Sequence, residues 1–195
     1  MEPASAAEAF LHIKVVMGMV LSLSLARLLT GIAGIIQHPG KGKVYLVHLG
    51  WALSLFLFII HIWWWEYWMH ALPALHFGVY LFLISFCCLF FLLCALLFPS
   101  SIDEYGGYEE YFISRRKWFF GVLALTYAVD LIDTAIKGQD RIASLGWEYP
   151  LRNIVYIALC GIAAYTPNRR FHALFVSLGL IYQVSFIFRA YDVLA

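Results

Sequence analysis

Stretches of apolar residues long enough to cross a lipid bilayer follow one another along the whole chain, separated by short polar turns. A membrane-crossing helix needs about 20 predominantly apolar residues. Windows of that length predict six spans, at residues 10–36, 44–67, 73–98, 118–137, 147–166 and 170–189. No internal repeat, low-complexity segment or linker divides the sequence, so we expect one transmembrane domain over residues 1–195.

The longest polar segment, Pro99 to Lys117, separates the third and fourth predicted spans. Ser101 and Glu104 have the spacing of a capping box, and tyrosines such as Tyr108 and Tyr111 recur at helical spacing. This pattern predicts a short amphipathic helix lying in the membrane interface. The expected fold class is therefore all-α: a polytopic integral membrane protein with a six-transmembrane-helix bundle and a short interfacial helix after the third span.

Composition supports a membrane protein and excludes some partners. The chain is 63% hydrophobic and only 13% charged, whereas soluble domains average about 45–50% apolar and about 25% charged residues. The mean hydropathy is +0.81, so we expect the lipid bilayer as the main partner. A formal net charge of +1 provides no basic face for nucleic acid. All four cysteines lie in apolar runs and are expected to be small core residues: Cys87, Cys88, Cys94 and Cys160.

The distribution of Lys and Arg predicts the orientation in the membrane. An even number of spans places both termini on one side, and cytoplasmic loops carry an excess of basic residues. The three odd-numbered loops hold seven of them: Lys41, Lys43, Arg115, Arg116, Lys117, Arg169 and Arg170. The opposite side holds five: Lys14, Lys137, Arg141, Arg152 and Arg189. We therefore expect a plasma or inner membrane location with both termini on the non-cytoplasmic side.

A row of small residues marks the first predicted span. Gly18, Ser22, Ala26, Thr30 and Gly34 recur at every fourth position. Such a small-xxx-small row lets two helix backbones approach closely. It predicts a packing face within the subunit or between subunits, and we expect a homo-oligomer because six short helices enclose little space.

The fourth predicted span carries a polar stripe. Thr126, Asp130, Asp133, Thr134 and Lys137 recur at one-turn spacing along an otherwise apolar helix. A carboxylate at the centre of a membrane helix costs about 2.5–3.5 kcal/mol. We therefore expect the stripe to face the protein interior, with Lys137 pairing with Asp133 four residues earlier.

Two further cations are candidates for charge compensation. Arg27 lies in the first span, and its estimated depth is within about 6 Å of that of Asp130. We hypothesise that these two side chains pair. Arg189 belongs to a weaker polar stripe with Tyr182, Ser185 and Asp192 at the end of the sixth span. A buried pair of Arg27 and Asp130 is also compatible with a purely structural role that fixes helix register.

The end of the second span is rich in tryptophan, which concentrates where the bilayer meets water. One interpretation is an aromatic belt in which Glu66 and His70 pair in the headgroup region. The other is an aromatic vestibule into which His61 projects, on a face shared with three tryptophans, Trp64, Trp65 and Trp68.

These patterns favour a small channel or transporter for protons or cations. Asp130, Asp133, Thr126 and Thr134 are the expected ion path. Arg27, Lys137 and Arg189 are the expected counter-charges, and the expected mouth residues are His61, Glu66 and His70. The alternatives are a non-catalytic accessory or assembly subunit, and a haem-binding redox protein in which His61 pairs with His12 or His76. Enzyme motifs, metal-ligand clusters and cofactor motifs are not found, so we favour a non-enzyme without a cofactor.

Overall fold

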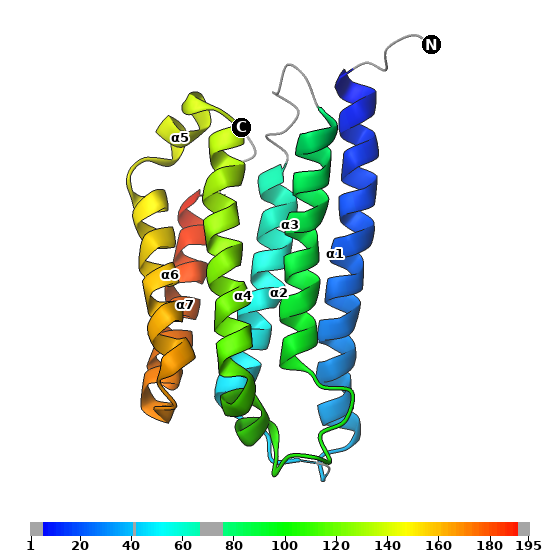
Figure 1. Ribbon diagram of the computed structural model, residues 1–195, viewed down its shortest axis with the longest axis vertical. Helices are drawn as coiled ribbons and strands as arrows, with labels where there is room; N and C mark the ends of the chain where they lie inside the picture. The colour runs from blue at the N-terminus through cyan, green and yellow to red at the C-terminus, as the bar shows by residue number, and fades with distance from the viewer. Residues whose placement is uncertain (1–5, 41, 67–75, 191–195) are drawn as a thin grey trace.

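The computed structural model describes residues 6–40, 42–66 and 76–190 (Figure 1). Within these residues the chain forms helices and no strands. The helices are α1 (Ala6–Gln37), α2 (Leu46–Trp65), α3 (Phe77–Leu97), α4 (Tyr108–Ile136), α5 (Gln139–Leu145), α6 (Glu148–Tyr165) and α7 (Arg169–Ala190). The all-helical fold expected from the hydrophobic pattern is therefore confirmed.

The long helices run alternately up and down in one bundle (Figure 1). α1 begins and α7 ends at the same end of the bundle, which we call the terminal end; the opposite end is the loop end. The short helix α5 connects α4 to α6 at the terminal end. α4 packs against α6 and α3, α1 packs against α3, and α7 packs against α2.

Five helices in the described part of the chain, α1 to α4 and α7, are long and apolar enough to cross a membrane. This supports a helical membrane protein. α6 has 18 residues and carries Glu148, Arg152 and Asn153 in its first turns, which lowers its hydropathy. Its role as a sixth span stays a prediction.

The predicted interfacial helix after the third span is wrong as a separate element. Residues 108–117 instead form the first turns of α4, which continues without a break to Ile136. The break falls earlier, at Gly107, whose φ of 139° is accessible mainly to glycine. Tyr111 and Phe112 are buried, so this segment packs into the bundle instead of lying on the membrane surface. Ser101 forms a local turn with Asp103 and caps no helix.

Aromatic side chains fill the core of the loop half. The Trp51 ring of α2 packs edge-on against Phe119 and Phe120 of α4 and Phe175 of α7, with ring centroids 5.0–5.6 Å apart. Edge-to-face packing of this kind adds about 0.5–1.5 kcal/mol per pair beyond area burial. Cys87, Cys94 and Cys160 are buried in the core as expected, whereas Cys88 is exposed.

The small-residue row of α1 is only partly used inside the bundle. Gly18 lies against the Trp63 ring, but Ser22, Ala26 and Thr30 are exposed. The close approach of α1 to the rest of the bundle occurs instead at Gly31, where any added Cβ would overlap the Phe98 ring. Most of the predicted packing face therefore remains available on the outer surface.

We predict opposite effects for alanine at two glycines of α1. Gly31→Ala should lower the free energy of unfolding by about 1–3 kcal/mol, because the new methyl group meets the buried Phe98 ring. Gly34→Ala is the matched control, since its Cβ meets no atom within 4 Å, and alanine raises helix propensity by about 1 kcal/mol. Unfolding in mixed detergent micelles measures both. Equal stability of the two variants would contradict the α1–α3 packing described above.

Candidate functional site

The polar stripe of α4 faces the interior of the bundle. Thr126, Asp130, Asp133 and Thr134 are all buried, with at most 3% of each residue exposed. We predicted this orientation from the sequence, because a charged side chain that faces lipid is costly. Asp130 and Asp133 nevertheless occupy two different polar environments, because they lie on neighbouring sides of the helix.

Asp133 belongs to a triad with Lys137 and Glu66. The Lys137 ammonium donates to Asp133 Oδ2 and, at 2.9 Å, to Glu66 Oε1. All three side chains are almost completely buried, at 0–1% exposure. The expected pairing of Asp133 with Lys137 is confirmed. Glu66 was expected at an exposed mouth, and this placement is wrong, because the end of α2 carries its carboxylate into the bundle beside Lys137. Its expected partner His70 lies outside the described residues.

The triad contains two carboxylates and a single ammonium group. Glu66 Oε2 and Asp133 Oδ1 are buried and accept no hydrogen bond within the described structure. The two carboxylates contact the same ammonium nitrogen, Lys137 Nζ, and therefore lie beside each other. Leaving a buried acceptor unsatisfied costs about 1–3 kcal/mol. The triad therefore lacks one donor and carries one negative charge in excess when both acids are ionised.

Asp130, in contrast, accepts three hydrogen bonds from α6 on a single oxygen, Oδ2. Its Oδ2 accepts from Tyr149 Oη at 2.8 Å, from Asn153 Nδ2 at 2.8 Å and from Arg152 Nη2 at 3.4 Å. The Tyr149 hydroxyl has one proton, so Thr134, at 2.7 Å, acts as the donor to Tyr149. The three donors at positions 149, 152 and 153 lie on one face of α6 because residues three and four apart are helical neighbours.

Arg152 is the functional residue that the sequence analysis missed. It was counted only as a basic residue for topology, although Tyr149, Arg152 and Asn153 form an i, i+3, i+4 polar cluster in the predicted fifth span. This spacing was the available signal. It does not by itself identify α4 as the helix on which the cluster packs.

The expected pairing of Arg27 with Asp130 is wrong. The Arg27 guanidinium donates to the Phe98 carbonyl, near the loop end. Arg27 lies about 32 Å along α1 from the terminal end, whereas Asp130 lies about 9 Å from the terminal end of α4. The depth estimate failed because α1 begins at Ala6 and is much longer than one bilayer crossing requires.

Two other expected site residues, Arg189 and His61, lie outside the two acid clusters. Arg189 pairs with the exposed Glu148, so it does not compensate the α4 carboxylates. The ring of His61 stacks on Trp65 with centroids 5.3 Å apart, and Trp65 in turn stacks on Tyr149. This stack connects His61 to the Asp130 cluster.

The histidines of the haem alternative have separate surroundings. The ring of His12 stacks on Tyr80 of α3, whereas His61 contacts rings of α2 and α7. The structure therefore does not direct these two imidazoles toward a common ligand. His76, the other candidate partner, is exposed at the start of α3.

Loss of the Lys137 ammonium should lower the free energy of unfolding strongly. Lys137→Met leaves Glu66 and Asp133 adjacent, buried and uncompensated, and removal of one partner from a buried ion pair costs about 3–5 kcal/mol. The double variant Lys137→Met/Glu66→Gln should recover part of this loss, because an amide donates to Asp133. Lys117→Met, at an exposed position of α4, should change stability by less than about 0.5 kcal/mol. Unfolding free energies in detergent test the series, and a Lys137→Met variant as stable as Lys117→Met would refute the buried triad.

Comparisons with models of protein families, with curated proteins and with solved structures find no match for this chain. Its function is therefore inferred from the geometry of its own residues.

Proposed function

We propose that this protein is a small membrane transporter that binds a proton between Glu66 and Asp133. The observation that carries the proposal is a pair of buried carboxylate oxygens, beside the Lys137 ammonium, that accept no hydrogen bond from the described residues. One proton between the two acids supplies the missing donor to both oxygens. It also neutralises the excess negative charge of the triad. Intramembrane acids arranged in this way are typical of proton relays.

A proton fits the triad better than a larger cation. Any ion that binds at the two carboxylates lies beside the Lys137 ammonium, and like charges repel strongly in a low-dielectric interior. A proton is held covalently by one oxygen and adds no volume. We therefore narrow the transported species expected from the sequence, protons or cations, to protons.

The aromatic core favours a transporter over an open channel. Between the triad and the loop end, the described core is closed by the rings of Trp51, Phe119, Phe120 and Phe175. Proton release on that side requires a rearrangement. The short helix α5 lies between Gly138 and Gly146, both at positive φ, and these glycines provide flexible joints for a movement of α6 relative to α4.

Exposed charge supports an orientation with the loop end in the cytoplasm. At the terminal end, the side chains of Lys137 and Arg152 are only 1% and 11% exposed and are held in internal ion pairs. At the loop end, Arg115 and Arg169 lie on the surface. Basic residues near the ends of membrane spans favour the cytoplasmic side, which agrees with the sequence count of seven against five.

The exposed row on α1 favours a second candidate function, an accessory subunit. Ser22, Ala26 and Thr30 form a surface on which another transmembrane helix can pack closely. In an accessory subunit, the only role of the buried charges is to fix the register of the helices. The same surface serves a homo-oligomer if the partner is a second copy of this chain.

Proton flux distinguishes the transporter from the accessory subunit. Glu66→Gln should reduce proton uptake into reconstituted vesicles at least tenfold, because the amide cannot exchange a proton. Its size and hydrogen bond to Lys137 are retained, so the fold should persist. Glu104→Gln, at an exposed loop position, should leave the flux unchanged. Negligible flux through the wild type and both variants would reject the transporter and favour the accessory subunit.

Association through α1 has its own test. Ala26→Phe should shift the protein toward the monomer in single-molecule photobleaching of vesicles, because a ring at this exposed position prevents close helix contact. Leu46→Phe, an exposed position on α2, is the control. An unchanged oligomer distribution in Ala26→Phe would exclude the α1 row as the contact surface.

A further inference from the structure

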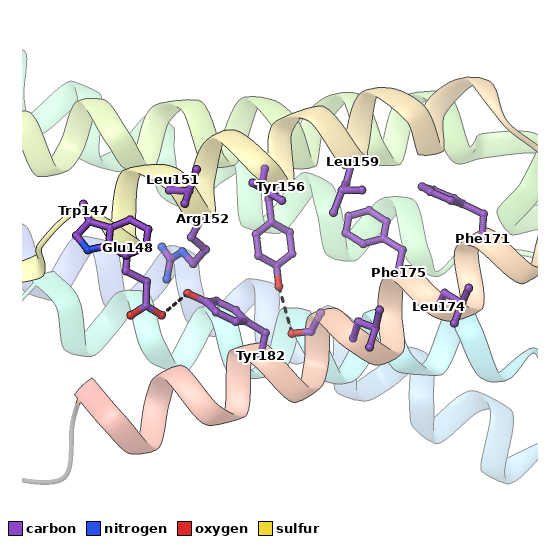
Figure 2. Close-up of a pocket in the computed structure, with 13 residues that line it drawn as sticks. Trp147, Glu148, Leu151, Arg152, Tyr156, Leu159, Phe171, Leu174, Phe175 and Tyr182 are labelled. Atoms are coloured by element: carbon purple, nitrogen blue, oxygen red, sulfur yellow. Dashed lines mark hydrogen bonds between the residues drawn. The ribbon is translucent and has the colours of Figure 1, made fainter.

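An apolar groove runs between α6 and α7, which contact each other less than either contacts the rest of the bundle (Figure 2). Its volume is about 650 Å³. Leu159, Phe171, Leu174 and Phe175 line one end, and Glu148, Arg152 and Tyr182 gather at the other (Figure 2). A hydrogen bond from Tyr156 to the Gly179 carbonyl joins the two helices midway. The groove is thus apolar along its length and polar only toward the terminal end.

The polar groups at that end differ in how many of their hydrogen-bonding atoms already have partners. Both oxygens of Glu148 already accept hydrogen bonds, from Tyr182 and from the Arg189 guanidinium. Arg152 uses Nε and Nη2 to contact Asn153 and Asp130. Its Nη1 group donates to no residue in the described part of the chain, although the side chain lines the groove. The groove therefore offers a charged donor, and a ligand that bears an acceptor complements it.

The shape of the groove favours a ligand with a single chain. One helix supplies each wall, α6 through Leu151, Val155 and Leu159 and α7 through Phe171, Leu174 and Leu178. One hydrocarbon chain lying along the two helices matches this shape. In a bilayer, the apolar wall gives little selectivity, because lipid tails are as apolar as leucine. Discrimination must come from the head of the ligand at Arg152.

We propose that the α6–α7 groove binds a single-chain amphipathic carboxylate, with its head on Arg152 Nη1 and its hydrocarbon chain along α6 and α7. Arg152 also contacts Asp130 through a long 3.4 Å interaction. A bound carboxylate therefore competes with Asp130 for the same guanidinium and connects the groove to the buried acids. A role of this ligand as a substrate carried together with the proton rests on the proposed function, whereas binding itself does not.

The test is photolabelling of the full-length protein in phosphatidylcholine nanodiscs with a diazirine analogue of palmitate. We expect label on residues that line the groove, displaced by excess palmitate and not by the corresponding alcohol. The double variant Arg152→Gln/Asp130→Asn removes both charges together, so no buried carboxylate is left uncompensated. It should weaken apparent palmitate affinity about tenfold, or about 1.4 kcal/mol. Asp130→Asn alone should strengthen binding, because it removes the internal competitor.

A matched pair of groove variants controls for partition into the bilayer. Val155→Trp fills the groove and should abolish the label, whereas Ile154→Trp, exposed on the same helix and outside the groove, should retain it. Equal labelling by the alcohol, displacement by a phospholipid analogue as effective as palmitate, or equal labelling of the two tryptophan variants would overturn the proposal. Glu66→Gln should bind palmitate normally, so loss of proton flux with intact labelling rejects only the transport function.

Discussion

The burial of the Asp130 carboxylate is the constraint on which the arrangement of α4 and α6 depends. A charge in the interior of a membrane protein is tolerated only where donors replace the lost water. In the part of the chain that the structure describes, the side chains that donate to Asp130 Oδ2 come from one face of α6. Because these donors are fixed at one-turn spacing, sliding α6 along α4 breaks several contacts at once. The carboxylate therefore fixes the register of the most extensive helix pair in the bundle.

Asp133 lies less than one turn away and has different surroundings. Its Oδ2 accepts from Lys137, which also contacts Glu66, whereas Asp133 Oδ1 and Glu66 Oε2 accept no hydrogen bond from the described residues. The Oδ2 atom of Asp130 has three donors, whereas a proton would supply the two acids beside Lys137 with a hydrogen bond. The same helix thus presents one carboxylate to the donors of α6 and, toward α2, a second carboxylate that we propose to bind a proton.

Arg152 connects Asp130 to the surface of the bundle. One side of its guanidinium contacts Asp130, and the other lines the α6–α7 groove. The arginine also lies over the rings of Tyr149 and Phe186, which hold its planar group in place. A ligand in the groove and a carboxylate in the core therefore interact with a single charge.

The sequence alone determined the helical membrane class, the inward direction of the α4 stripe and the pairing of Lys137 with Asp133. Each follows from local physics, because helical periodicity and the cost of charge in lipid act within one segment. It did not identify Arg152 as the partner of Asp130 or Glu66 as the second acid of the triad. Those contacts join α4 to α6 and to α2, and they depend on which helices are neighbours and where each helix begins. Hydrophobic periodicity does not reveal which helices are neighbours or where each helix begins. Only the tertiary structure therefore determined these contacts.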